Sequence, residues 1–268
     1  MITELIKKRK VYFDGATGTV LQKMGLASGE CPELWNIKYP DRITELHRSY
    51  LDAGCDIVKT NTFGINSEKF ENWDQLIAAA IECAKKAVSG RRDKFIAFDM
   101  GPCGHLLEPL GDMPFERAIE LFSQNVRVAY KNGADLILIE TMNDSLETKA
   151  AVLAAKENCP LPVFVTNVYD EAGKLMTGAD VRAMVAMLEG LRVDAIGINC
   201  SLGPDKMIPT VKELVKYSSL PVIVNPNAGL PDVKDGDTVY NINADDFSDI
   251  MKTISQMGVS LLGGCCGT

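Results

Sequence analysis

Three of the eight cysteines occur in a pattern that can bind a metal ion. Cys200 follows Asn199 at the end of an apolar run, and Cys265 and Cys266 are adjacent and flanked by glycines. Three thiolates are a soft ligand set suited to Zn²⁺, and three protein ligands leave the fourth tetrahedral position open for a reacting group. The flanking glycines would let adjacent residues both turn their sulfur atoms inward. The pattern therefore predicts a catalytic zinc site at these three cysteines.

Two other interpretations of the paired cysteines stay open on spacing alone. They could be free thiols, or a vicinal pair that forms a redox disulfide. The other five cysteines lie on predicted helices, turns and loops, and we interpret them mainly as filler: Cys31, Cys55, Cys83, Cys103 and Cys159.

A glycine-rich turn and two carboxylates form a second candidate site. The turn runs from Asp14 to Thr19, and its backbone N–H groups can hold a carboxylate or a phosphate. It lacks the lysine that follows in nucleotide-binding loops, and a plain tight turn is an equally good interpretation. Asp14 and Glu140 could hold a cationic group such as an amino-acid ammonium. Taken singly, each is more often a structural hydrogen-bonding residue.

The elements that must position these residues alternate along the chain. Short β-branched runs predict eight strands, and segments of helical period predict seven helices between them. The strands are expected at 11–16, 57–63, 95–101, 136–141, 162–169, 195–201, 221–228 and 260–265, and the helices at 41–54, 67–90, 114–132, 144–158, 179–190, 204–218 and 244–257.

This alternation predicts an α/β fold, a (β/α)₈ TIM barrel formed by residues 1–268 as one domain, with a doubly wound sheet as the alternative. A last, eighth helix is absent after the final strand. We therefore expect either closure by something else or a module, the N-terminal one, of a longer protein. In such a barrel the C-terminal strand ends converge on one rim. Those ends are polar here: Asp14, Asn61, Asp99, Glu140, Asn199, Asn227 and the three cysteines.

The composition excludes some classes of binding partner and indicates a cellular compartment. Twenty-eight basic residues against 36 acidic ones give a net charge of −8, and no basic face for nucleic acid is evident. No segment approaches the roughly 20 apolar residues of a membrane-spanning helix, and the first residues are too short for a signal-peptide core. We expect a cytoplasmic protein with reduced cysteines, and neither nucleic acid nor membrane as a partner.

Five motifs together resemble the zinc-dependent homocysteine S-methyltransferase family. They are DGATGT at 14–19, TNTFG at 60–64, GINCS at 197–201, PNAG at 226–229 and GGCCGT at 263–268. The similarity runs in register from about residue 5 to the last residue. Segments 34–37 and 199–204 look most similar to the homocysteine-binding module of cobalamin-dependent methionine synthases.

The resemblance implies roles for individual residues. It implies Zn²⁺ bound by Cys200, Cys265 and Cys266, with Asn227 as an oxygen ligand when substrate is absent. It implies that Asp14 and Glu140 hold the homocysteine ammonium. The backbone of Gly15, Ala16, Thr17 and Gly18 would bind the carboxylate, and Asn61, Asp99 and Asn199 would shape the pocket. The implied reaction is methyl transfer to the homocysteine thiolate, which gives methionine.

The resemblance also implies partners. The methyl donor would be methylcobalamin bound elsewhere, with cobalamin-carrying and folate-binding modules on the same or a partner chain. Thr17 and Cys103 occupy positions that vary in the family, so they do not indicate the donor. One alternative is a stand-alone methyltransferase that uses betaine, S-methylmethionine or another small donor. An alternative of another class is a non-catalytic zinc-binding or redox-sensing barrel.

Overall fold

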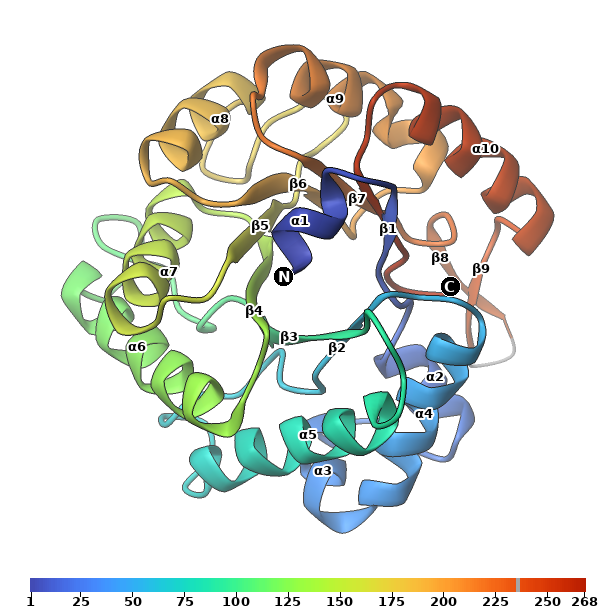
Figure 1. Cartoon of the computed structure of the whole chain (residues 1–268). Helices are drawn as coiled ribbons and strands as arrows, with labels where there is room; N and C mark the ends of the chain where they lie inside the picture. Colours follow the sequence, from blue (N-terminus) through green and yellow to red (C-terminus); the bar gives the residue numbers. More distant parts are fainter. Residues whose placement is uncertain (235–236) are drawn as a thin grey trace.

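Eight parallel strands form a ring in the computed structural model, which describes residues 1–234 and 237–268 (Figure 1). Their order around the sheet is β1-β10-β7-β6-β5-β4-β3-β2, and a parallel bridge from Phe13 to Ile57 brings β1 back to β2. The predicted (β/α)₈ barrel is therefore confirmed. The strands are β1 (Val11–Tyr12), β2 (Ile57–Lys59), β3 (Phe95–Met100), β4 (Leu136–Met142), β5 (Val163–Asn167), β6 (Ala195–Asn199), β7 (Val222–Asn225) and β10 (Leu261–Leu262).

All seven predicted helices are present around the ring (Figure 1). They are α4 (Pro40–Asp52), α5 (Trp73–Val88), α6 (Phe115–Asn132), α7 (Ser145–Asn158), α8 (Val181–Gly190), α9 (Pro204–Tyr217) and α10 (Ala244–Gln256). The prediction was wrong at the start of α5, which begins six residues later than expected. There the Asn66 side chain accepts hydrogen bonds from the backbone N–H groups of Glu68 and Lys69, which stabilises a turn instead of a helix.

The sequence did not predict the short elements. These are α1 (Ile2–Ile6), α2 (Gly18–Lys23), the 3₁₀ helix η1 (Pro32–Leu34), α3 (Trp35–Lys38) and the antiparallel hairpin of β8 (Pro231–Lys234) and β9 (Asp237–Tyr240). Each has six residues or fewer, which is too short for a helical period to be read from sequence.

The core has two layers, and β4 illustrates both. Leu136 and Leu138 point into the barrel, where they belong to the same buried cluster as Phe164. Ile137 and Ile139 point outward into the larger cluster beneath the helices. This explains why β4 is apolar on successive residues instead of alternating.

Helix α1 closes the N-terminal end of the barrel. Ile2 is 2% exposed and belongs to the interior cluster, and Leu5 and Ile6 pack against it. Figure 1 shows α1 within the ring of strands. The interior is thus a packed core, and the strands present their C-terminal ends at the other side.

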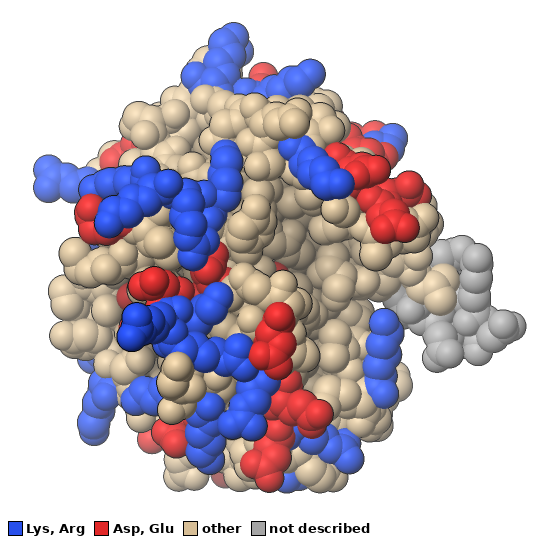
Figure 2. All heavy atoms as spheres, turned by 45° about the vertical axis from the view of Figure 1, so that its right-hand side comes forward, with Lys and Arg blue, Asp and Glu red and all other residues tan. Residues whose placement is uncertain are grey.

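The surface carries both signs of charge. On the face in Figure 2, Lys and Arg side chains are interspersed with Asp and Glu. Among the residues that the structure describes, no helix combines the length and apolar character needed to cross a membrane.

Candidate metal and substrate site

Cys200, Cys265 and Cys266 lie together at the C-terminal ends of β6 and β10. Their sulfur atoms all lie within 4.8 Å of one another, and each residue is half-buried. Zn–S bonds of about 2.3 Å in a tetrahedral site place sulfur atoms roughly 3.8 Å apart, a separation that this limit includes. Among the side chains that the structure describes, this is the one cluster of three or more potential ligands among His, Cys, Asp and Glu. The donor set therefore fits zinc.

The loop after β7 fixes the backbone of two of these cysteines. The Cys200 N–H donates to the Asn225 carbonyl at 3.0 Å, and the Cys265 N–H donates to the Pro226 carbonyl at 2.8 Å. Cys200 has a φ of 57°, in the left-handed region that non-glycine residues rarely adopt. Such strain is characteristic of functional sites, where surrounding contacts hold the backbone in place.

The same loop holds Cys266 from both sides. Its carbonyl accepts from the Ala228 N–H at 2.9 Å, and its N–H donates to Asn227 Oδ1 at 3.0 Å. The oxygen that the family resemblance assigns to the metal is therefore already bound to the backbone of a cysteine. We retain a metal contact of Asn227 as a prediction only.

Glycines allow the paired cysteines to turn toward Cys200. A Cβ on Gly263 would lie 2.6 Å from Phe13 Cβ, closer than real Cβ contacts come, and 3.0 Å from the Asp14 carbonyl oxygen, tighter than most of them. Gly267 has a φ of 83°, which also favours glycine.

A pocket of about 520 Å³ opens beside the cysteines. It brings together most of the predicted site residues: Gly15, Ala16, Thr17, Gly18, Asn61, Asp99, Glu140, Cys200, Cys265 and Cys266. Asp14, Asn199 and Asn227 are buried but do not line it.

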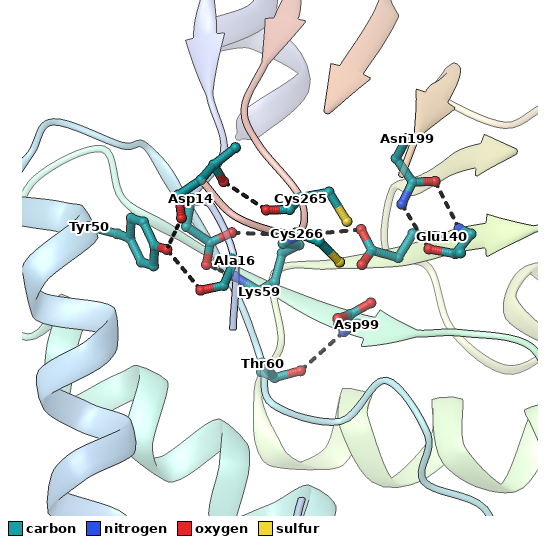
Figure 3. A network of polar contacts seen from close by, with 12 residues as sticks. Asp14, Ala16, Tyr50, Lys59, Thr60, Asp99, Glu140, Asn199, Cys265 and Cys266 are labelled. Atoms are coloured by element: carbon teal, nitrogen blue, oxygen red, sulfur yellow. Dashed lines mark hydrogen bonds and ion pairs between the residues drawn. The ribbon is translucent and has the colours of Figure 1, made fainter. Parts of the chain in front are cut away.

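Two predicted pocket residues have amides that are engaged in the protein. Asn199 Oδ1 accepts from the Thr141 N–H at 2.9 Å and from Thr166 Oγ1 at 2.8 Å, and its Nδ2 donates to Thr141 Oγ1 at 2.8 Å (Figure 3). Asn61 Nδ2 donates to the Pro32 carbonyl at 2.8 Å, which holds η1 against the pocket. Asn199 therefore shapes the site indirectly, by holding the residue next to Glu140.

In the pocket wall, a buried lysine lies between the two predicted ammonium-binding carboxylates. Lys59 Nζ lies 3.5 Å from Glu140 Oε2 and 4.0 Å from Asp14 Oδ1, while the Lys59 N–H donates to Asp14 Oδ2 at 2.8 Å (Figure 3). Burial raises the pKa of Asp14 to about 7 and raises the pKa of Asp99 well above its usual range. Burial disfavours the charged lysine, but the nearby carboxylates outweigh it and raise the Lys59 pKa.

The thiols favour protonation in the absence of a cation. The pKa of Cys265 is raised to about 12, mainly by its hydrogen bond with Cys200 and also by burial. A divalent cation among the three sulfur atoms would reverse this preference, because it stabilises thiolates.

Several residues that line the pocket were not among the predicted site residues, including Lys59 and Tyr240. The sequence could have indicated Lys59, because a charged residue at the end of the otherwise apolar strand β2 is unusual. Tyr240 lies at the end of β9, in the hairpin that no periodicity indicated. The remaining cysteines are buried or half-buried outside the pocket lining.

Comparison with known proteins places the chain in a family. A family model described as homocysteine S-methyltransferase matches residues 11–268. A methionine synthase from Mycobacterium leprae (strain TN) is 32% identical over 289 residues, and one from Mycobacterium tuberculosis (strain ATCC 25618 / H37Rv) is also 32% identical. Each alignment covers 100% of this chain but only 24% of the relative, so the chain spans about a quarter of their length.

Solved structures share the fold. The metallated form of the homocysteine methyltransferase MmuM from Escherichia coli superposes with a TM-score of 0.82 at 23% identity, covering 99% of this chain and 94% of that one. Its apo form gives a TM-score of 0.80 at 24% identity. At this level of identity the likeness shows a common barrel.

Proposed function

The chain belongs to the homocysteine S-methyltransferase family, and from that premise we propose that it binds Zn²⁺ and homocysteine and presents the substrate sulfur for methylation to methionine. The observation that carries the proposal is the convergence of Cys200, Cys265 and Cys266 at the wall of a pocket that carboxylates also line. When bound there, zinc would stabilise a thiolate at neutral pH.

The chain's own residues bind and orient the amino acid in this proposal. Glu140 offers a carboxylate to the ammonium group at the pocket wall, with Asp14 behind it. The turn Gly15–Gly18 lines the same pocket and offers backbone N–H groups to the substrate carboxylate. Asp99 carries a raised pKa through burial, and as a neutral acid it can donate a hydrogen bond to the substrate.

We further propose that the methyl donor is methylcobalamin carried by another module. The support is that the methionine synthases matched here are about four times as long as this chain, since 24% of their length is aligned. Cobalamin-carrying and folate-binding modules on the same or a partner chain would then be the partners. The eight free thiols fit a reducing compartment such as the cytoplasm.

Metal analysis tests the zinc site. We expect about one tightly bound zinc per chain in the unmodified protein, and loss of that zinc in Cys200→Ala, because two thiolates hold the ion less tightly. Cys159→Ala is the matched control, since Cys159 is buried at the end of α7, far along the chain from the cluster, and should retain the metal. A folded, zinc-free wild-type protein would contradict the proposal.

A donor panel tests the activity. Methionine formation from homocysteine is measured with free methylcobalamin, betaine and S-methylmethionine in turn. Turnover with methylcobalamin alone supports a cobalamin-dependent module, whereas turnover with a small donor supports a stand-alone enzyme. A redox sensor would instead change its free-thiol count with oxidant and ignore zinc.

A further inference from the structure

Lys59 is unusual in its burial. It is 4% exposed, and among the residues whose burial the structure describes no other Lys or Arg is buried. Its ammonium lies 3.5 Å from Glu140 Oε2 and 4.0 Å from Asp14 Oδ1. Both separations exceed the roughly 2.7–2.9 Å of a close charge-assisted hydrogen bond. The lysine is thus held between two carboxylates without bonding tightly to either.

The surrounding acceptors are incompletely used. Asp14 Oδ1 and Asp99 Oδ1 are buried and have no hydrogen-bond partner. Leaving such atoms unpaired costs free energy, so this cluster has capacity for another hydrogen-bond donor. An ammonium group supplies three N–H donors and a matching positive charge.

The position of Lys59 in the pocket wall affects how the ammonium group of a ligand can reach Asp14. Lys59 lines the pocket, whereas Asp14 does not. A ligand that enters beside the cysteines therefore meets Lys59 before Asp14. Its ammonium can contact Asp14 only if the Lys59 ammonium moves away (Figure 3).

We propose that Lys59 is the resident counter-ion of the substrate-ammonium site and a determinant of its specificity. This inference rests on the proposed function, which assigns Asp14 and Glu140 to the ammonium of homocysteine. Lys59 occupies the carboxylate pair in the free protein and competes with the incoming amino acid. It thereby weakens the preference of the pocket for thiols that carry an ammonium group.

Electrostatics sets the size of the effect. Two positive charges about 5 Å apart repel strongly enough, at the effective dielectric of protein sites, to change an affinity roughly tenfold or more. Removing the Lys59 charge should therefore favour ligands with an ammonium over otherwise identical ligands without one.

Binding calorimetry on the zinc-loaded chain at pH 8 tests this. The two probes are L-homocysteine and 4-sulfanylbutanoate, which share the thiol and the carboxylate but differ in the ammonium. Because both carry the thiol, any zinc contribution cancels in the ratio of their dissociation constants. We expect Lys59→Met to raise the preference for homocysteine about tenfold, and Lys59→Arg to leave the preference near the wild-type value.

Lys94→Met is the matched control. Lys94 also pairs with an aspartate, Asp56 at 3.4 Å, but lies just before β3 at the opposite end of the barrel, and its loss should not change the ratio. If Lys59→Met does not fold, Lys59→Gln is measured in the same way.

An unchanged or lower preference for homocysteine in the folded Lys59→Met or Lys59→Gln variant overturns the role of Lys59. The wild-type protein separates this failure from that of the proposed function. If neither thiol binds the zinc-loaded wild type, the proposed function fails, and this inference fails with it.

Discussion

At the scale of single residues, the site depends on side chains that no ligand needs to touch. Asn199 uses both amide atoms to hold Thr141, which has a φ of 63° and directly follows Glu140. The left-handed backbone at Thr141 costs about 1–3 kcal/mol, and it persists because this amide fixes it. The direction of the Glu140 carboxylate therefore rests on a residue from another strand.

Replacing Asn199 should test that dependence. Asn199→Ala removes three hydrogen bonds, one buried and two partly buried, and should lower the free energy of unfolding by about 2–4 kcal/mol, measured by urea denaturation. It should also weaken homocysteine binding while zinc remains bound. Asn132→Ala, which removes one hydrogen bond on α6, should cost less than about 1 kcal/mol. Equal losses in the two variants would argue against the role of Asn199.

At the scale of elements, α4 contains a polar group that the fold leaves without a partner. His47 is fully buried, and neither ring nitrogen has a hydrogen bond. Burial lowers the pKa of His47 to about 4, from a usual value near 6.5. The folded protein therefore resists protonation of His47, and the unfolded chain binds more protons between these two values.

This pKa shift predicts that the effect of His47 on the free energy of unfolding depends on pH. Stability supplied by the neutral histidine is complete above pH 6.5 and is lost as the pH falls toward 4. His47→Leu removes this dependence. The free energy of unfolding of the variant, relative to that of the wild type, should therefore be about 2 kcal/mol higher at pH 5 than at pH 8. Urea denaturation at both pH values measures the difference. A pH-independent difference would show that His47 does not titrate in this way.

Length decides which elements the sequence can predict. The helices α4 to α10 span ten residues or more, enough for their period to be read. The strands β1 and β10 have only two residues each, because their polar, glycine-rich continuations leave the sheet to form the site. The prediction therefore placed Asp14 and Cys265 within strands, whereas in the structure both follow the strand ends.

At the scale of the whole molecule, the barrel depends on a contact between distant parts of the sequence. Helix α1 packs Ile2 against side chains of several strands at the N-terminal end of the barrel. No periodicity indicated this five-residue helix, because its role exists only once the ring has formed. The same holds for Lys59, whose partners are Asp14, just after β1, and Glu140 on β4.

Truncating Ile2 should destabilise the folded barrel. Ile2→Ala removes a side chain that is 2% exposed and should cost about 2 kcal/mol or more in the free energy of unfolding. Ile37→Ala is the control, because Ile37 is 49% exposed and should change stability by less than about 0.5 kcal/mol. Thermal or urea unfolding of both variants measures the difference. If Ile2→Ala were as stable as the control, α1 would not seal the barrel.

The seal formed by α1 has a consequence for the order of events during turnover. Apolar side chains fill the barrel between α1 and the pocket, so ligands reach the cysteines only from the C-terminal side of the strands. In the proposed function, amino acid, methyl donor and product would share this one entrance. A bulky donor seated over that entrance would trap whatever lies beneath it. Under the proposed function, the thiol would then have to enter before the donor docks, and the methylated product could depart only after the donor withdraws.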